Sequence, residues 1–276
     1  MINIFETQPD WLAEDDRQTR KVHIPSPDKP NDSLSYNINP EFMYDRHRVM
    51  LPPEKIAGKT ILDLGSCRGA TGAWCLENGA KHYTGVEKLL RYTIPSKKLF
   101  AKHFEPEQYE IVTADVEAFD TDNKYDIVIA SGILYGILDS FNFLRRMARF
   151  SKDMVILDSV HPFNGYRRLF PDASDEDRYR VAKILSIIQP SERIRMTGAL
   201  DPSITDEKEK AANTFSGGSV KMTASIVSLE AARILMKKNG FEYVPGLYEL
   251  AEQEIDYYYD VRKHNRFMAE YRKVEQ

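Results

Sequence analysis

The chain has 276 residues with 42% hydrophobic content, which is enough for one domain of ordinary size with additions. Its formal net charge of −4 at pH 7 argues against a globally basic nucleic-acid-binding protein. No apolar run approaches the ~18 residues of a membrane helix, and the polar N-terminus shows no signal-peptide pattern, so we expect a soluble, cytoplasmic protein with no membrane partner.

Residues 1–58 are polar and contain several proline breaks, which predicts an N-terminal clasp rather than a separate domain. Within this clasp, residues 39–51 have a proline near their start and apolar side chains at helical spacing. They predict a helix that leads into the first strand. Tyr36 and Tyr44 either lie over a bound ligand or anchor the clasp on the core, and anchoring is the favoured interpretation.

Residues 59–87 are the stretch around which the rest of the chain is organised. They predict a strand, a glycine-containing turn, a short helix and a second strand that ends in Glu87. Gly65 and Gly69 lack a Cβ atom where the backbone must pass close to a ligand, and the helix that follows presents free N–H groups there. A carboxylate at the tip of the second strand, about 20 residues on, is where such folds bind the two hydroxyls of a ribose. The unit therefore predicts a nucleoside-binding half.

The spacing of the glycines bears on which nucleoside is bound. A dinucleotide fingerprint has glycine at its first, third and sixth places, and these places hold Gly65, Cys67 and Ala70 here. A nicotinamide-dependent oxidoreductase is therefore a disfavoured alternative. Cys67 and Cys75 both lie in this unit, and we interpret them as free small apolar residues rather than a disulfide or a metal pair.

The pattern D-x-G-x-x-x-G, which starts at Asp63, resembles motif I of the class I S-adenosylmethionine-dependent methyltransferases. The resemblance implies that Asp63 faces the methionine amino group of the cofactor and that Glu87 holds its ribose. It also implies that the turn passes under the cofactor. The turn residues that would bind it are Gly65, Ser66, Cys67 and Gly69. The family usually has a third glycine at the position of Cys67.

Residues 109–113 predict the third strand, after a helix-like stretch at 89–104. The resemblance implies that Asp115, just past this strand, accepts a hydrogen bond from the adenine amino group, while the backbone N–H of Val116 meets a ring nitrogen. A carboxylate suits an exocyclic amine because it offers only acceptors. The alternative is that Asp115 caps a turn or a helix, where Asp is also favoured.

Residues 125–130 are a β-branched run typical of the buried middle of a parallel sheet, and 154–158 predict the fifth strand. Loops at the carboxyl ends of such strands line the ligand crevice. We therefore expect Ser131 to contact the cofactor and Tyr135 to lie near the transferred methyl group as a candidate catalytic residue. His161 is the candidate general base, because it follows the fifth strand and an imidazole titrates near neutral pH. The alternative is a structural histidine, since many methyl transfers need only alignment.

No metal site is predicted, because the remaining histidines are scattered along the chain. Residues 162–219 interrupt the alternation of strands and helices, with a helix expected at 178–188. The stretch is too long for an ordinary connection and predicts an inserted cap or lid. Because it follows the fifth strand, we expect it to cover the acceptor side of the crevice; the alternative is a rigid decoration on the sheet edge.

The core resumes over residues 220–276. Ser228 is expected to cap a helix that ends at Gly240. Residues 241–248 and 255–261 are then expected to be the last two strands. Together with the core at 59–161, they predict a Rossmann-like, doubly wound α/β fold with a seven-stranded, mostly parallel sheet and a C-terminal antiparallel hairpin.

A weaker resemblance concerns residues 125–139 and 217–244, which are similar to parts of the bacterial tRNA wobble-uridine carboxymethyltransferases. It implies tRNA as an alternative acceptor, although the acidic balance of the chain argues against this. Our main expectation is S-adenosylmethionine as the cofactor and methyl transfer to an oxygen or nitrogen of a small molecule. A nucleoside-binding partner protein without transfer activity is the non-enzyme alternative.

Overall fold

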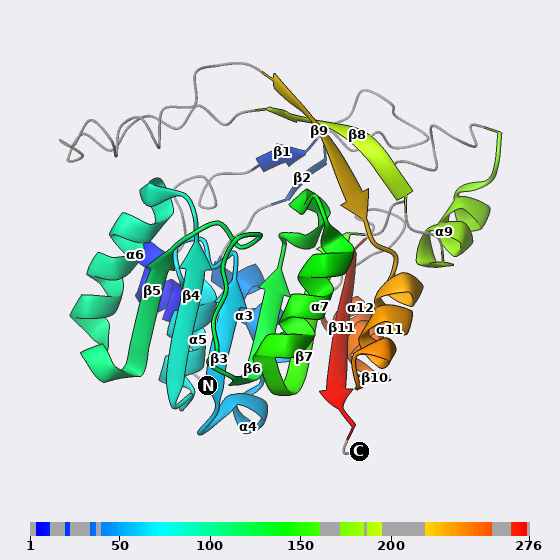
Figure 1. Cartoon of the computed structure of the whole chain (residues 1–276). Helices are drawn as coiled ribbons and strands as arrows, with labels where there is room; N and C mark the ends of the chain where they lie inside the picture. Colours follow the sequence, from blue (N-terminus) through cyan, green and yellow to red (C-terminus); the bar gives the residue numbers. More distant parts are fainter. Residues whose placement is uncertain are drawn as a thin grey trace.

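A seven-stranded sheet with the strand order β10-β11-β7-β6-β3-β4-β5 forms the centre of the molecule (Figure 1). Its strands are β3 (Thr60–Leu64), β4 (His82–Glu87), β5 (Tyr109–Thr113), β6 (Tyr125–Ser131), β7 (Ser151–Val160), β10 (Phe241–Val244) and β11 (Arg266–Lys273). The strands from β5 to β7 in this order are parallel to one another, whereas β11 is antiparallel to both β7 and β10. The expected doubly wound, mostly parallel sheet with an antiparallel C-terminal pair is confirmed.

This computed structural model describes residues 4–11, 20–22, 34–36, 40–160, 172–184, 187–194, 219–255 and 266–274. Its helices are α1 (Ile4–Thr7), α3 (Pro40–Met50), α4 (Pro53–Ile56), α5 (Ala70–Glu77), α6 (Leu90–His103), α7 (Ser140–Phe150), α9 (Asp175–Ile184), α11 (Leu229–Lys238) and α12 (Leu247–Glu254). Short 3-10 turns are η1 (Pro9–Trp11), η2 (Pro106–Gln108) and η3 (Leu134–Gly136). Within the described ranges, no helix has the length and apolar content needed to cross a membrane.

Alternate residues of the central strands point to opposite faces of the sheet, and helices cover both faces. One core cluster contains Ile61 and Ile127 together with side chains of α3 and α5. The other contains Leu62 and Val128 together with side chains of α7 and α11. Because both faces are buried, the central strands are continuous apolar runs, as the sequence predicts.

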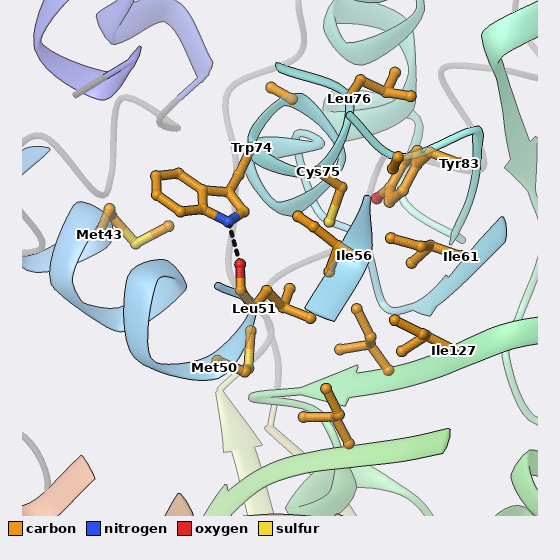
Figure 2. Packing of buried hydrophobic residues seen from close by; sticks show 14 of the residues in the cluster. Met43, Met50, Leu51, Ile56, Ile61, Trp74, Cys75, Leu76, Tyr83 and Ile127 are labelled. Carbon is orange, nitrogen blue, oxygen red and sulfur yellow. Dashed lines mark hydrogen bonds between the residues drawn. The ribbon is translucent and has the colours of Figure 1, made fainter. Parts of the chain in front are cut away.

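The helix expected near residue 40 is confirmed as α3, which packs against α5 (Figure 2). The indole N–H of Trp74 donates to the carbonyl of Leu51, just after α3, at 2.8 Å. Tyr44 meets the same indole edge-on, with ring centroids 5.6 Å apart. Tyr44 therefore anchors the clasp on the core, as favoured from the sequence, whereas Tyr36 lies in the short strand β2 (Leu34–Tyr36), which pairs with β1 (Arg20–Val22).

His47 provides a second, polar link between α3 and α5. Its side chain is fully buried, and Nδ1 donates to the carbonyl of Met43 at 2.6 Å. Nε2 therefore accepts from the hydroxyl of Thr71 at 3.2 Å. Burial, helped by the charge of Arg46, lowers the pKa of His47 to about 3. The imidazole is thus neutral in the folded protein and positions the start of α5.

The C-terminal part departs from the sequence expectation in its boundaries. The strand expected at 241–248 is wrong at its end, because β10 ends at Val244 and α12 begins at Leu247. The strand expected at 255–261 lies, beyond Ile255, outside the described residues, and β11 begins at Arg266. Gly246 has a φ of +107°, and its N–H donates to the Glu249 side chain at 3.0 Å. This glycine and carboxylate start a helix where the sequence pattern predicts a continued strand.

The last strand was missed because it carries charged residues that are paired inside the fold. In β11, Glu270 accepts from Lys55 at 2.6 Å and from Arg272 at 2.7 Å. These pairs let charged residues occupy a strand that is buried along most of its length. The helix α11 begins as predicted, since the hydroxyl of Ser228 accepts from the backbone N–H of Ala231 at 3.2 Å.

The described part of the insertion contains α9 and β8 (Ile187–Ile194). β8 forms an antiparallel hairpin with β9 (Ser219–Ile226), which lies almost wholly in the stretch where the core was expected to resume. The expected helix at 178–188 is wrong at its end, because residues from Ile187 onward belong to β8. Pro190 lies within this strand, where a two-stranded sheet leaves one edge unpaired. In Figure 1 the hairpin lies above the carboxyl ends of the parallel strands, and β9 contacts η3.

Candidate cofactor and acceptor site

The turn between β3 and α5 has the backbone geometry that the glycine pattern predicts. Gly65 and Gly69 have φ angles of +87° and +91°. A Cβ atom on Gly65 would lie 2.5 Å from the side chain of Ile133, and one on Gly69 would lie 2.4 Å from that of Phe100. Both positions therefore need glycine for conformation and for space.

Cys67 occupies the middle of the turn, between Gly65 and Gly69. Its φ is +51°, in the left-handed region that costs a side-chain-bearing residue about 1–2 kcal/mol. Its backbone N–H donates to Oε2 of Glu87 at 3.2 Å. The turn is thus held in the left-handed conformation by a bond to the carboxylate at the tip of the neighbouring strand.

Glu87 ends β4 with both carboxylate oxygens engaged by the backbone. Oε2 accepts from Cys67, and Oε1 accepts from the N–H of Leu89 at 2.9 Å. Burial raises the pKa of Glu87, while these backbone hydrogen bonds and the charge of Lys88 act in the opposite direction. The main chain therefore fixes the direction of this carboxylate before any ligand arrives.

A pocket of about 360 Å³, including its open mouth, lies beside Glu87 at the carboxyl ends of β3, β4 and β5. Its lining residues are Gly65, Glu87, Lys88, Asp115, Val116, Glu117, Ile133, Gly136 and Ile137. The structure thus brings Gly65, Glu87, Asp115 and Val116 together, as the sequence predicts, and adds a wall from the segment after β6.

Asp115 caps a turn, which is one of the two roles that the sequence left open as alternatives. Its Oδ1 accepts from the backbone N–H of Glu117 at 2.9 Å, so this oxygen caps the following turn. Its Oδ2 lies 3.5 Å from Nζ of Lys88, in a partly exposed pair at the pocket. Glu117 in turn accepts from the backbone N–H of Leu138 at 2.9 Å. The carboxylate of Glu117, which was not predicted from the sequence, thus links the turn after β5 to the segment after β6.

Asp63 and Ser66 are not among the residues that line the pocket. Asp63 is 2% exposed and accepts from the hydroxyl of Tyr83 at 2.8 Å. Burial raises the pKa of Asp63 to about 6, against the effects of this hydrogen bond and of the charge of Arg46. The buried side chain of Ser66 fills the space beside Gly85, where a Cβ atom would lie 2.9 Å from its hydroxyl.

A row of polar side chains, which we call the polar row, continues from Asp63 along the same edge and face of the sheet. Its members are Asp63 of β3, Ser131 of β6, Asp158 of β7 and Arg266 of β11, and the strand register places them on the face covered by α3 and α5. Nearer the amino ends of the strands, the corresponding positions on this face are apolar, as at Ile61 and Ile127. The face therefore changes from apolar to polar at the end where ligands bind in such sheets.

Asp158 is the centre of the polar row and is fully buried. Its Oδ1 accepts from Nε and Nη2 of Arg266 at 3.2 and 2.8 Å. Its Oδ2 accepts from the hydroxyl of Ser131 at 2.8 Å and from Nε of Arg46 at 3.1 Å. Nη2 of Arg46 also donates to Asp158 and to the hydroxyl of Ser131.

These contacts set the charge state of the row. Burial alone would raise the pKa of Asp158, but the guanidinium groups of Arg266 and Arg46 more than offset it and hold that pKa below its usual range. Ser131, expected to contact the cofactor, uses its hydroxyl within this network. Sequence reasoning missed the ion pairs of this network, because Arg46 and Arg266 each lie more than a hundred positions from Asp158.

Of the two candidate catalytic residues, the described part of the structure includes Tyr135 but not His161. Tyr135 lies in η3, next to the pocket-lining Gly136, and is 38% exposed. His161 lies outside the described residues. In the part of the chain that the structure covers, no group of three or more His, Cys, Asp or Glu side chains is arranged to hold a metal ion.

No protein-family model matches the sequence, and none of the curated proteins matches it. Solved structures match the fold over most of its length. One of them is described as an S-adenosylmethionine-dependent methyltransferase from Listeria monocytogenes. The match covers 85% of this chain and 99% of the Listeria chain, with a TM-score of 0.52 and 19% sequence identity. A second such enzyme, from Mesorhizobium loti, matches over 84% of this chain and 98% of its own, with a TM-score of 0.51 and 15% identity.

A third match is the magnesium protoporphyrin IX methyltransferase of Synechocystis with bound S-adenosylhomocysteine. It covers 85% of this chain and 84% of its own, with a TM-score of 0.52 and 12% identity. At these identities the likeness concerns the arrangement of the backbone. The chain has the fold of the class I S-adenosylmethionine-dependent methyltransferases.

Proposed function

We propose that the chain is an S-adenosylmethionine-dependent methyltransferase that binds the adenosine half of its cofactor in the pocket beside Glu87. The observation that carries this proposal is the convergence of Gly65, Glu87, Asp115 and Val116 on that one pocket. They come from the carboxyl ends of three different strands and the turns that follow them, and the fold is that of methyltransferases. Such convergence is what an adenosine site requires.

The donor and acceptor chemistry of the pocket fits adenosine. Glu87 is oriented by backbone N–H groups and has acceptor capacity for ribose hydroxyls. Asp115 uses one oxygen to cap its turn and presents the other beside Lys88, where an exocyclic amine can compete for it. When bound, the cofactor supplies an electrophilic methyl group on a sulfonium centre. The protein then orients the acceptor and excludes water.

Calorimetric titration separates this function from the nicotinamide alternative. We expect S-adenosylmethionine and S-adenosylhomocysteine to bind and NAD to show no heat of binding. Binding of NAD in place of the two methionine-derived ligands would overturn the proposal. Cofactor binding without methyl transfer to any fraction of a cell extract would instead favour a nucleoside-binding partner protein.

The acceptor side is proposed to lie between η3 and the inserted cap. The hairpin of β8 and β9 lies above the carboxyl ends of the strands and reaches η3, and one enzyme of the same fold acts on a small molecule, magnesium protoporphyrin IX. We infer that the acceptor is a small molecule methylated on oxygen or nitrogen. Transfer of a labelled methyl group to the small-molecule fraction of an extract is expected; transfer to the RNA fraction would indicate the tRNA alternative.

The cap itself can be tested by shortening it. Replacing residues 172–215 by a short glycine linker is expected to leave cofactor binding intact and abolish transfer to the natural acceptor. Unchanged turnover of the same acceptor by the folded, shortened protein would reduce the insertion to a decoration of the sheet edge.

The general base remains a proposal as well. The role of His161 is tested with the variant His161→Asn. This substitution is expected to lower turnover about a hundredfold and to leave cofactor affinity nearly unchanged. Tyr135→Phe, at the pocket rim, is the companion variant. An unaltered rate in either variant would show that its side chain is not needed for proton removal.

A further inference from the structure

Arg46 lies where a cofactor that starts in the adenosine pocket would continue. The pocket spans the ends of β5, β4 and β3, and the next strand in the sheet is β6. Arg46 comes from α3, yet its guanidinium donates to Ser131 at the end of β6 and to Asp158 of β7. The sheet order therefore places this cation next to the pocket, on the side away from Asp115.

The strand register shows how near Arg46 lies to the glycine turn. Asp63 of β3 pairs with Ile129 of β6, so Ser131 stands level with Gly65, the first glycine of the turn. Neighbouring strands lie about 4.8 Å apart. A guanidinium that is bonded to the hydroxyl of Ser131 is therefore within about two strand spacings of the glycine turn.

The electrostatics of the neighbouring groups agree with this position. The charge of Arg46 acts on Asp63, where it opposes the rise in the pKa of that carboxyl, and on His47, whose pKa it helps to lower. Arg46 is thus close enough to β3 to be felt by the acid at the end of that strand. Its side chain is 13% exposed, whereas that of Asp158 is fully buried.

We propose, on the basis of the proposed function, that Arg46 binds the α-carboxylate at the methionine end of the cofactor. The bonds to Asp158 and Ser131 orient the planar guanidinium, and Asp158 and Ser131 act as positioning residues for it. A guanidinium suits this group because its fork of N–H donors matches the two oxygens of a carboxylate. Asp63, one strand away, carries the opposite charge and faces the ammonium end.

A pair of ligands tests this assignment directly. S-adenosylhomocysteine carries the amino-acid end, whereas 5′-methylthioadenosine has the same adenosine and sulfur but no carboxylate. We expect Arg46→Met to weaken binding of S-adenosylhomocysteine by about 10- to 100-fold, as for the loss of a charge-assisted hydrogen bond. Binding of 5′-methylthioadenosine should stay within about twofold of the wild type.

Two further variants control for charge and for folding. Arg48→Met removes a cation from the same helix, where it pairs with Glu254 at 3.0 Å, and should leave both affinities unchanged. Arg46→Lys keeps the charge but loses the fork, and should weaken S-adenosylhomocysteine less than Arg46→Met does. Asp158 keeps Arg266 as a partner in both Arg46 variants, so the fold is expected to survive, as circular dichroism will check.

The outcomes separate this inference from the proposed function. A wild type that binds neither ligand refutes the proposed function. A wild type that binds both ligands makes the variants decisive. If Arg46→Met and Arg46→Lys weaken the two ligands equally, or weaken neither ligand, the assignment of Arg46 to the carboxylate is overturned. Selective loss of S-adenosylhomocysteine binding supports it.

Discussion

The adenosine pocket and the polar row lie side by side at one end of the same sheet, but they are held together differently. In the pocket, Glu87 and Asp115 each accept from a backbone N–H group two residues further along the chain, and Glu87 also accepts from that of Cys67, 20 positions earlier. In the polar row, Asp158 is fixed by the side chains of Arg46 and Arg266, which lie 112 and 108 positions away. One half is built from local backbone and the other from long-range ion pairs.

The difference indicates how each half should respond to change. A carboxylate that accepts backbone hydrogen bonds at a pocket edge can be removed without leaving a buried charge behind. A fully buried carboxylate between two guanidiniums cannot, because its loss leaves uncompensated cations. Substitutions in the pocket should therefore affect ligand affinity, and those in the polar row should affect stability. The following predictions test that division.

The largest effect is expected for Asp158→Asn. Removing the charge between Arg46 and Arg266 should lower the free energy of unfolding by about 3–5 kcal/mol. Asp153→Asn is the matched control, because Asp153 is 38% exposed and pairs with Arg272 at 3.1 Å, so its loss should cost at most about 1 kcal/mol. Urea denaturation measures both. Equal losses in the two variants would contradict the division.

Glu87→Ala is expected to weaken binding of S-adenosylhomocysteine by about 10- to 100-fold, which corresponds to about 1.5–3 kcal/mol for a charge-assisted hydrogen bond to a ribose hydroxyl. Its unfolding midpoint should stay close to that of the wild type. Glu110→Ala, at an exposed position of β5, should leave affinity unchanged. Calorimetry on the folded variants decides, and an unaltered affinity in Glu87→Ala would show that the ribose is bound elsewhere.

Stability should also depend on pH through His47. The unfolded imidazole binds a proton near its ordinary pKa of 6.5, whereas the buried one does so only near 3. The unfolded state therefore gains protons first, and stability from this residue falls as pH drops through that window, by about 2 kcal/mol between pH 7 and 5. Asp63 acts in the opposite sense, because its raised pKa of about 6 favours the folded state as pH falls towards 3.8.

Comparing the wild type with His47→Gln isolates the histidine, since Asp63 is present in both. The wild type should lose more stability than the variant between pH 7 and pH 5. Parallel stability curves for the two proteins over that interval would mean that His47 is protonated in the folded state.

The smallest effect is expected for Asp115→Asn. An asparagine can still cap the turn at Glu117, so the fold should be unchanged. It replaces one acceptor by a donor at the edge that would face the adenine amino group, so affinity for S-adenosylhomocysteine should fall by about tenfold, which is about 1.4 kcal/mol. Asp115→Ala removes both functions and should reduce stability as well. An asparagine variant with wild-type affinity would leave capping as the role of Asp115.

The division between local backbone bonds and long-range ion pairs also explains which parts of the site could be predicted from the sequence. The glycine turn, Glu87 and Asp115 were found because the residues that shape them are neighbours in the chain. The polar row was not found, because nothing near Arg46 or Arg266 signals that they meet Asp158. The last strand was missed for a related reason: Glu270 reads as a surface residue until Lys55 is brought beside it. Long-range pairing of charges is the information that a local pattern lacks.

The position of β11 has a consequence for the order in which the protein can fold. This strand is the last in sequence, yet it inserts between β7 and β10, which are both synthesised earlier. A nascent chain can form the adenosine pocket from residues 59–137. Until β11 is added, however, Asp158 has Arg46 and Ser131 as partners but lacks Arg266, and the sheet remains open at β7. Closing contacts of such large sequence separation form late and slowly. The ligand-binding surface is therefore completed in two stages, with the adenosine side ready before the side where Arg46 lies.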